Sequence, residues 1–117
     1  MFLHEITEEN FDSIIDEITL EEKINLIILF DESLEDEVNN LWLWNKSFYD
    51  VKNVCDRIIC TGKRCNDLCL KLKMDGCEDL VSMCDDIDMS FSSINGSRYN
   101  THIMYPSNSK TLLTRYR

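Results

Sequence analysis

An apolar run that passes directly into an amphipathic pattern constrains this chain more than any other feature. Ile24–Phe30 is short, uncharged and rich in isoleucine, which is typical of a strand buried inside a sheet. Ser33 follows as a helix N-cap with Asp36 three residues later, and apolar residues recur at helical spacing up to Leu41. The stretch therefore predicts a central strand that runs into a helix.

The rest of the pattern alternates helices and strands along 117 residues, a length typical of one domain at 1–117. Apolar spacing predicts helices over 7–18 and 65–74, with Gly76 ending the second, and one long or two short helices over 34–54. Strands are expected at 80–84, 101–105 and 112–116, the last two forming a hairpin. Together these elements predict an α/β fold with a mixed central sheet flanked by helices.

Acidic side chains outnumber basic ones by 22 to 12, and the formal net charge is −10. Nucleic acids and anionic membranes both need a basic surface, so we expect neither as a partner. No apolar run is long enough to cross a bilayer. The acidic cluster at 31–37 lacks EF-hand spacing and the six cysteines lack paired zinc knuckles, so no metal and no cofactor are expected.

Residues 24–41, 99–116 and 3–12 follow one another with the order and approximate spacing of three motifs of a known family. They resemble the Cys-x-x-Cys strand and helix, the C-terminal hairpin, and the leading strand and first helix of the protein disulfide isomerase family. The resemblance covers roughly half of the chain. It implies a thioredoxin-like domain without the final helix, located in the endoplasmic reticulum or secretory pathway, with a cytoplasmic location as the alternative.

Each working part of that family's redox site is replaced in this sequence. Glu35 and Val38 occupy the positions of the two cysteines, Leu29 that of the buried acid, and Asn100 that of the cis-proline. None of these side chains can attack a disulfide, because that reaction needs a low-pKa thiolate. The resemblance therefore implies a redox-inactive, chaperone-like domain that is not an enzyme and acts in protein folding. Its partner would be a polypeptide client or a neighbouring domain.

The resemblance also places the binding surface around the former active site, where the candidate peptide-binding residues are Leu34, Leu41, Trp42 and Tyr99. Two alternative functions stay open. A displaced pair such as Cys60 with Cys65 would make the chain a thiol–disulfide oxidoreductase. A role as scaffold alone would make it a purely structural or assembly protein.

Cysteines and two short motifs add the last expectations. Cys55, Cys60 and Cys65 flank a turn at 61–64 and are candidates for a disulfide if the compartment is oxidising. Asn45 and Asn95 each begin an Asn-x-Ser sequon and are candidate glycosylation sites.

Overall fold

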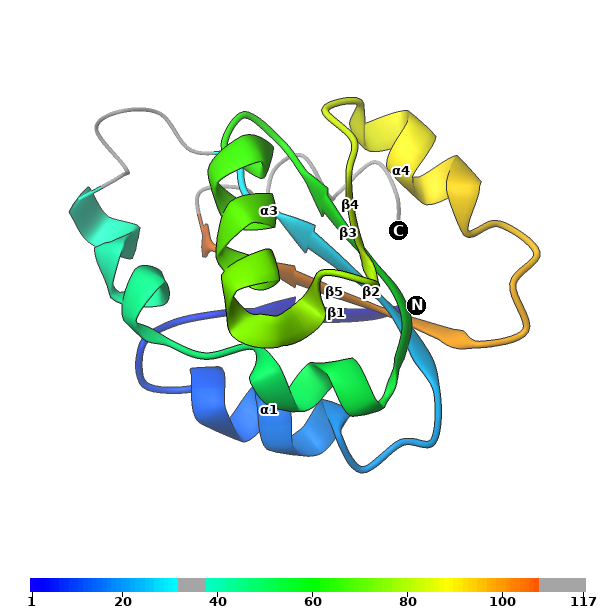
Figure 1. Ribbon diagram of the computed structural model, residues 1–117, viewed down its shortest axis with the longest axis horizontal. Coiled ribbons are helices and arrows are strands. Elements are labelled where there is room, and N and C mark those ends of the chain that lie inside the picture. Colours follow the sequence, from blue (N-terminus) through cyan, green and yellow to red (C-terminus); the bar gives the residue numbers. More distant parts are fainter. Residues whose placement is uncertain (32–37, 108–117) are drawn as a thin grey trace.

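The computed structural model describes residues 1–31 and 38–107, with the backbone alone at 38–40. Five strands form one sheet in the order β1-β5-β2-β3-β4 (Figure 1). Their bounds are Phe2–Glu5 for β1, Ile24–Leu29 for β2, Cys55–Thr61 for β3, Val81–Met83 for β4 and Asn100–Tyr105 for β5. All four pairings between these neighbouring strands are parallel. The protein is therefore an α/β protein built on a parallel sheet.

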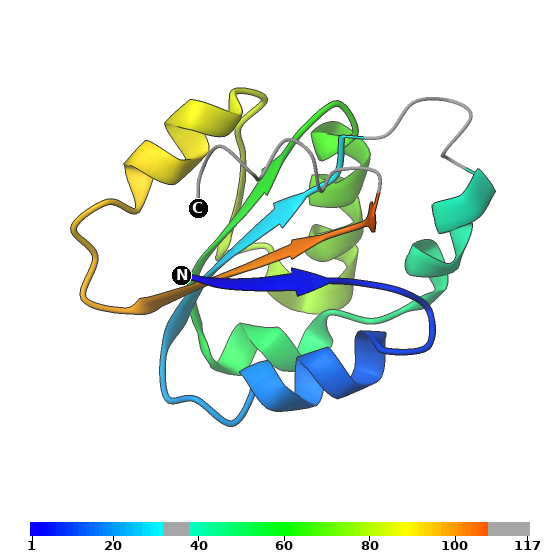
Figure 2. The same ribbon diagram turned by 180° about the vertical axis from the view of Figure 1, so that it is seen from behind.

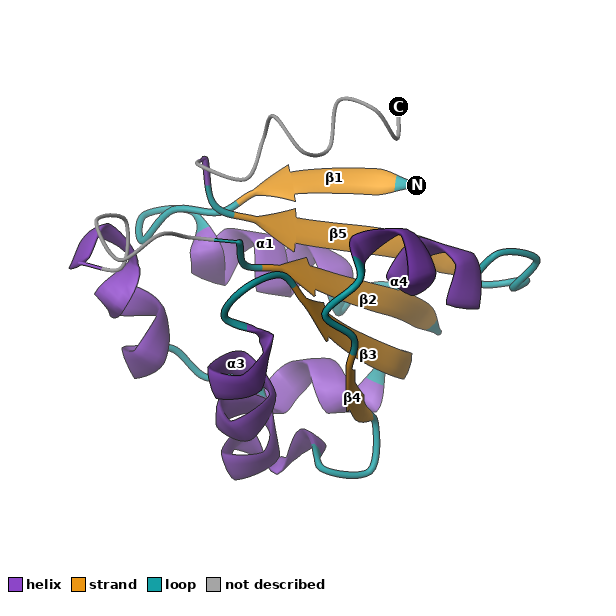
Figure 3. Cartoon of the chain, turned by 90° about the horizontal axis from the view of Figure 1, so that it is seen from above, coloured by secondary structure: helices purple, strands orange, loops and turns teal. Residues whose placement is uncertain are grey.

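Helical segments form the crossovers that parallel strands require. They are α1 (Phe11–Ile18), η1 (Val38–Asn45), η2 (Tyr49–Asn53), α3 (Cys65–Leu72), η3 (Lys73–Cys77) and α4 (Ile87–Ser93). Crossovers to β2, β3 and β4 all move across the sheet in one direction, whereas the crossover from β4 to β5 moves back. Because such crossovers are right-handed, α4 lies on one face of the sheet and the other helices lie on the opposite face (Figure 3).

The central strand β2 is buried on both faces, which explains its continuous apolar run. Ile24, Leu26 and Ile28 enter the larger core, which α1, the 3₁₀ segments and α3 complete. Ile27 and Leu29 point the other way, into the smaller core beneath α4. Figure 2 shows β1, β5, β2 and β3 side by side from behind.

The helix expected over 7–18 is confirmed as α1, but it begins at Phe11 because residues 8–10 form a turn that precedes it. Thr7 and Asn10 bond reciprocally, with the Thr7 N–H donating to Asn10 Oδ1 at 2.7 Å and the Asn10 N–H donating to Thr7 Oγ1 at 3.2 Å. The four apolar residues of the helix are all buried, as their spacing predicts: Phe11, Ile14, Ile15 and Ile18.

The prediction of a mixed sheet is wrong for the described strands, because all of their pairings are parallel. Residues 100–105 do form a strand, but β5 lies between β1 and β2 and runs parallel to both. Its expected hairpin partner at 112–116 and the helix start at Ser33 lie outside the described residues. The strand near 80–84 exists as β4, yet it forms an exposed edge rather than a buried strand. A thioredoxin-like arrangement is therefore not confirmed.

Candidate functional site

The former active-site positions do not come together in this fold. Leu29 ends β2 and is fully buried, whereas Asn100 pairs with Ile24 at the opposite end of the same strand. Six residues of strand separate these ends by roughly 16 Å. If β5 ran antiparallel to β2, Asn100 would lie next to Leu29. Because β5 runs parallel to β2, Asn100 lies beside Ile24 instead. Glu35 lies outside the described residues, and only the backbone of Val38 is described.

The peptide-binding candidates are divided in the same way. Leu41 is half exposed on η1, and the Trp42 ring packs edge-on against Phe11 with centroids 5.8 Å apart. Tyr99 immediately precedes β5 at the amino end of the sheet, and Leu34 lies outside the described residues. The described candidates therefore lie on two separate parts of the molecule, with Leu41 and Trp42 on η1 and Tyr99 before β5.

A tight turn joins the carboxyl end of β3 to α3. Gly62 has φ of 100°, and a Cβ atom there would lie 2.5 Å from the carbonyl oxygen of Phe30, so only glycine fits. The Lys63 N–H donates to Asp31 Oδ1 at 3.0 Å, and the Arg64 N–H donates to the Phe30 carbonyl at 3.0 Å. These bonds lock the turn onto the end of β2 and present two cationic side chains at this edge.

A groove of about 350 Å³ begins at this turn and runs between η1 and α3. Arg64 lies 5.8 Å from the centre of the Trp44 ring and forms an ion pair with Asp67 at 2.9 Å. Leu70 and Met74 line the groove although they are 60% and 79% exposed. The groove therefore combines an aromatic wall, an apolar floor and charged rims. Its lining is completed by Lys71 and Asp75, which form an ion pair at 3.0 Å.

The turn also lies at a topological switch point. The crossover after β3 passes over one face through α3, and the crossover after β4 passes over the other through α4. Ligands of open α/β sheets bind at the carboxyl ends of strands at such points. Thr61 ends β3 here, and its hydroxyl is buried without a hydrogen-bond partner among the described residues. The carboxyl edge around Gly62 is therefore the candidate functional site.

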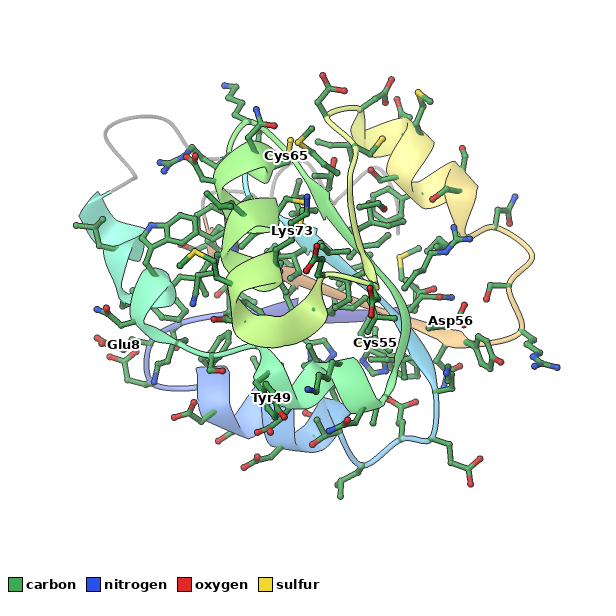
Figure 4. The ribbon with its side chains drawn as sticks, in the orientation of Figure 1. Glu8, Tyr49, Cys55, Asp56, Cys65 and Lys73 are labelled. Atoms are coloured by element: carbon green, nitrogen blue, oxygen red, sulfur yellow. The ribbon has the colours of Figure 1, made fainter. Side chains whose placement is uncertain are left out.

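The cysteines do not support redox chemistry. All six are free thiols, so the disulfide considered among Cys55, Cys60 and Cys65 is not formed. Burial raises the pKa of Cys55 to about 12 and that of Cys60 further still. A thiolate nucleophile needs the opposite shift. Burial also raises the pKa of Cys65, which begins α3 beside Asp85 (Figure 4).

A chain of side chains ties β1 to the middle of β5, where His102 pairs with Leu26 of β2. His4 Nε2 lies 2.8 Å from His102 Nδ1, and His102 Nε2 contacts the Glu21 carboxylate. The Phe2 ring stacks on His102 with centroids 4.8 Å apart. Burial and the neighbouring His102 lower the pKa of His4, although Glu17 and Glu21 act in the opposite direction. The cluster holds the short edge strand in place.

Within residues 1–31 and 38–107, no group of three or more histidine, cysteine or acidic side chains could hold a metal ion. In the same ranges, no helix is long and apolar enough to cross a membrane. Asn45 and Asn95 are both exposed, and their glycosylation stays a prediction.

Sequence reasoning identified 61–64 as a turn but missed the strand before it. The signal was the apolar run Ile58–Cys60 followed by Gly62 and a helical pattern, which is typical of a strand–glycine–helix unit. Asp56 and Arg57 concealed it, because they are exposed at the amino end of β3 and interrupt the apolar pattern.

Comparison with known families overturns the resemblance to protein disulfide isomerases. The family described as MurT ligase C-terminal matches residues 8–108. None of the curated proteins matches the chain. The functions derived from the earlier resemblance are wrong for the same reason, whether a redox-inactive folding module, a displaced-cysteine oxidoreductase or a purely structural protein.

Two further expectations that rested on that resemblance are also wrong. A location in the endoplasmic reticulum is wrong, because this family is related to bacterial cell-wall synthesis. The expectation of a non-enzymatic protein is wrong at the level of the family, which is part of a ligase. The matched range contains every described helix and every strand except β1. The chain therefore belongs to the MurT ligase C-terminal family.

Proposed function

We propose that this chain is the C-terminal module of a ligase that modifies bacterial cell-wall precursors in the cytoplasm. The observation that carries the proposal is the family match over 8–108, which coincides with the parallel α/β sheet. A module of this kind contributes a binding face to a reaction that the whole ligase performs.

The carboxyl edge is the face that best suits this role. Ligases couple bond formation to the cleavage of a nucleoside triphosphate, so their reaction centres hold anionic groups. Lys63 is exposed on the Gly62 turn and Arg64 stands beside the Trp44 groove, although the chain as a whole carries a charge of −10. Cations at the switch point of the sheet would orient an anionic substrate next to an aromatic wall.

The test is charge reversal at this edge in the complete ligase that carries the module. We expect Lys63→Glu with Arg64→Glu to lower nucleoside triphosphate-dependent ligation of a peptidoglycan precursor about tenfold or more, since two attractive charges become repulsive. Product is measured by mass spectrometry, and thermal melting checks that the fold is retained.

A matched control makes the same change of charge elsewhere. Lys23→Glu with Lys52→Glu reverses two cations near the amino end of the sheet, where Lys23 precedes β2 and Lys52 lies in η2. This pair should leave ligation within about twofold of the unmodified enzyme. Equal losses in both double variants, or no loss in either, would show that the carboxyl edge is not the working face.

A further inference from the structure

Two adjoining cavities lie at the amino end of the sheet, away from the carboxyl edge. Their volumes are about 530 Å³ and about 310 Å³, and both are lined by Ile94, Asn95 and Gly96 in the turn that follows α4. Gly96 has φ of 87°, and no atom lies within 4 Å of the place where its Cβ would be. The turn therefore leaves open space between α4 and the sheet, of a size that small ligands occupy.

Both a hydrogen-bond donor and a hydrogen-bond acceptor line the smaller cavity. Asn25 is buried in β2 at 1% exposure and donates through Nδ2 to Ser97 Oγ at 2.9 Å. That bond leaves the Asn25 carbonyl oxygen at the cavity wall as an acceptor. Ser97 Oγ also accepts from the Tyr99 N–H at 3.3 Å, so the hydroxyl hydrogen of Ser97 remains for a ligand.

The charged side chains at the cavities are of both signs, which suits an uncharged ligand better than an anion. Arg57 lines the smaller cavity, but its guanidinium donates to the Ser93 carbonyl at 3.0 Å. Arg98 donates to the Tyr99 hydroxyl at 2.8 Å. Asp56 and Asp88 line the two cavities with negative charge; Figure 4 labels Asp56 beside the segment that links α4 to β5. These carboxylates would repel a phosphate or carboxylate ligand, whereas they would not repel an uncharged ligand.

Apolar surface completes the larger cavity. Tyr99 and Phe91 line it with aromatic rings, together with Ile94. The Arg98 guanidinium lies over the Tyr99 ring at 4.9 Å from its centre, so a ligand would stack on the opposite face of that ring. A flat ring face attracts the C–H groups of a ligand, while the amide, hydroxyl and carboxylate groups nearby satisfy its hydroxyls. A molecule with an apolar C–H face and a dense rim of hydroxyls matches both requirements, and such molecules are sugars.

We propose that these two cavities form a binding site for a neutral sugar, with Asn25 and Ser97 as its polar contacts and Tyr99 as its stacking platform. The site lies at the opposite end of the sheet from the carboxyl edge and does not depend on the ligase role. It gives the chain a second contact surface, specific for neutral hydroxyl-rich ligands.

The experiment titrates the ¹⁵N-labelled chain with N,N′-diacetylchitobiose and follows backbone amide signals by NMR. We expect saturable shifts confined to 25, 56–57 and 91–101. Tyr99→Ala should weaken binding about tenfold, because truncation removes the stacking surface. Ser97→Ala should weaken it about threefold by removing one hydroxyl contact.

Tyr49→Ala is the matched control, since Tyr49 is an exposed tyrosine on η2, which packs on the opposite face of the sheet from α4 (Figure 4), and should leave affinity unchanged. Inorganic phosphate serves as the anionic probe and should produce no saturable shift at the same residues. The proposal is overturned if the disaccharide causes no saturable shifts, if Tyr99→Ala binds as tightly as the unmodified chain, or if phosphate saturates the same signals.

Discussion

The carboxyl and amino ends of the sheet are held by different kinds of contact. At the carboxyl end, the donors are backbone N–H groups of the Gly62 turn: that of Arg64 bonds to the Phe30 carbonyl and that of Lys63 to the Asp31 carboxylate. At the amino end, side chains bond to side chains, as in the pairs Asn25–Ser97 and Asn100–Glu21. Backbone bonds depend on the shape of the chain, whereas side-chain bonds depend on residue identity and protonation.

This difference separates a rigid end from an adjustable one. A turn that admits only glycine can present Lys63 and Arg64 in one fixed arrangement, which suits a substrate that must be oriented for reaction. An open turn lined by amide and hydroxyl groups can accommodate a ligand without moving the strands.

Replacing glycine should have the largest effect, and it should differ between the two ends. Gly62→Ala adds a Cβ against the Phe30 carbonyl oxygen at a positive φ, so we expect a loss of about 2–3 kcal/mol in the free energy of unfolding. Gly96→Ala meets only the strain of positive φ and should lose about 1 kcal/mol. Urea denaturation of both variants measures the difference. Equal losses would mean that the close approach at Gly62 does not constrain the turn.

Thiol labelling should distinguish the two ends more modestly. Cys55 begins β3 at the amino end, and burial raises its pKa to about 12, so little thiolate forms at pH 8. Cys84 follows β4 at the carboxyl end and is partly exposed. Peptide mapping after brief iodoacetamide treatment of the folded chain should therefore find Cys84 modified well before Cys55. Early labelling of Cys55 would show that the amino end opens more readily than its packing indicates.

The smallest expected effect is on the pH dependence of stability, through His4 in the cluster that joins β1 to β5. The folded-state pKa of His4 lies below the ordinary value of 6.5, so the unfolded chain binds more protons as pH falls through that value. Stability that is present above pH 6.5 should decline as the pH drops through the folded-state pKa. In His4→Gln this contribution is removed, and melting temperatures should fall less steeply across the same range. Melting curves of the two proteins with identical slopes against pH would exclude His4 as the titrating group.

Some elements follow from local pattern alone. The apolar spacing of α1 and the unbroken apolar run of β2 predicted both elements, because burial on one helix face or on both strand faces imposes those patterns directly. The turn at Gly62 was also visible in the local sequence, because glycine marks positions where the chain turns. The strand β3 was missed because its second and third residues, Asp56 and Arg57, are exposed and interrupt the apolar pattern.

The candidate site could not be predicted in the same way. Its members come from the ends of β2 and β3, from η1 and from α3, and only the order of strands brings these segments to one edge. The expected site failed for a related reason, since the resemblance placed Asn100 at the former active site with Leu29, whereas the parallel pairing puts it at the other end of β2. The family match, rather than any single motif, identified the chain as a member of the MurT ligase C-terminal family.

The sequence by itself determined the buried face of α1, the position of β2 and the turn at Gly62. The direction of β5 was decided only by the tertiary structure. Side chains alternate between the two faces of a strand in the same way whether its neighbours are parallel or antiparallel, so the pattern of residues 100–105 fits either arrangement. The choice depends on the crossover through α4, which returns the chain across the sheet and places β5 between β1 and β2.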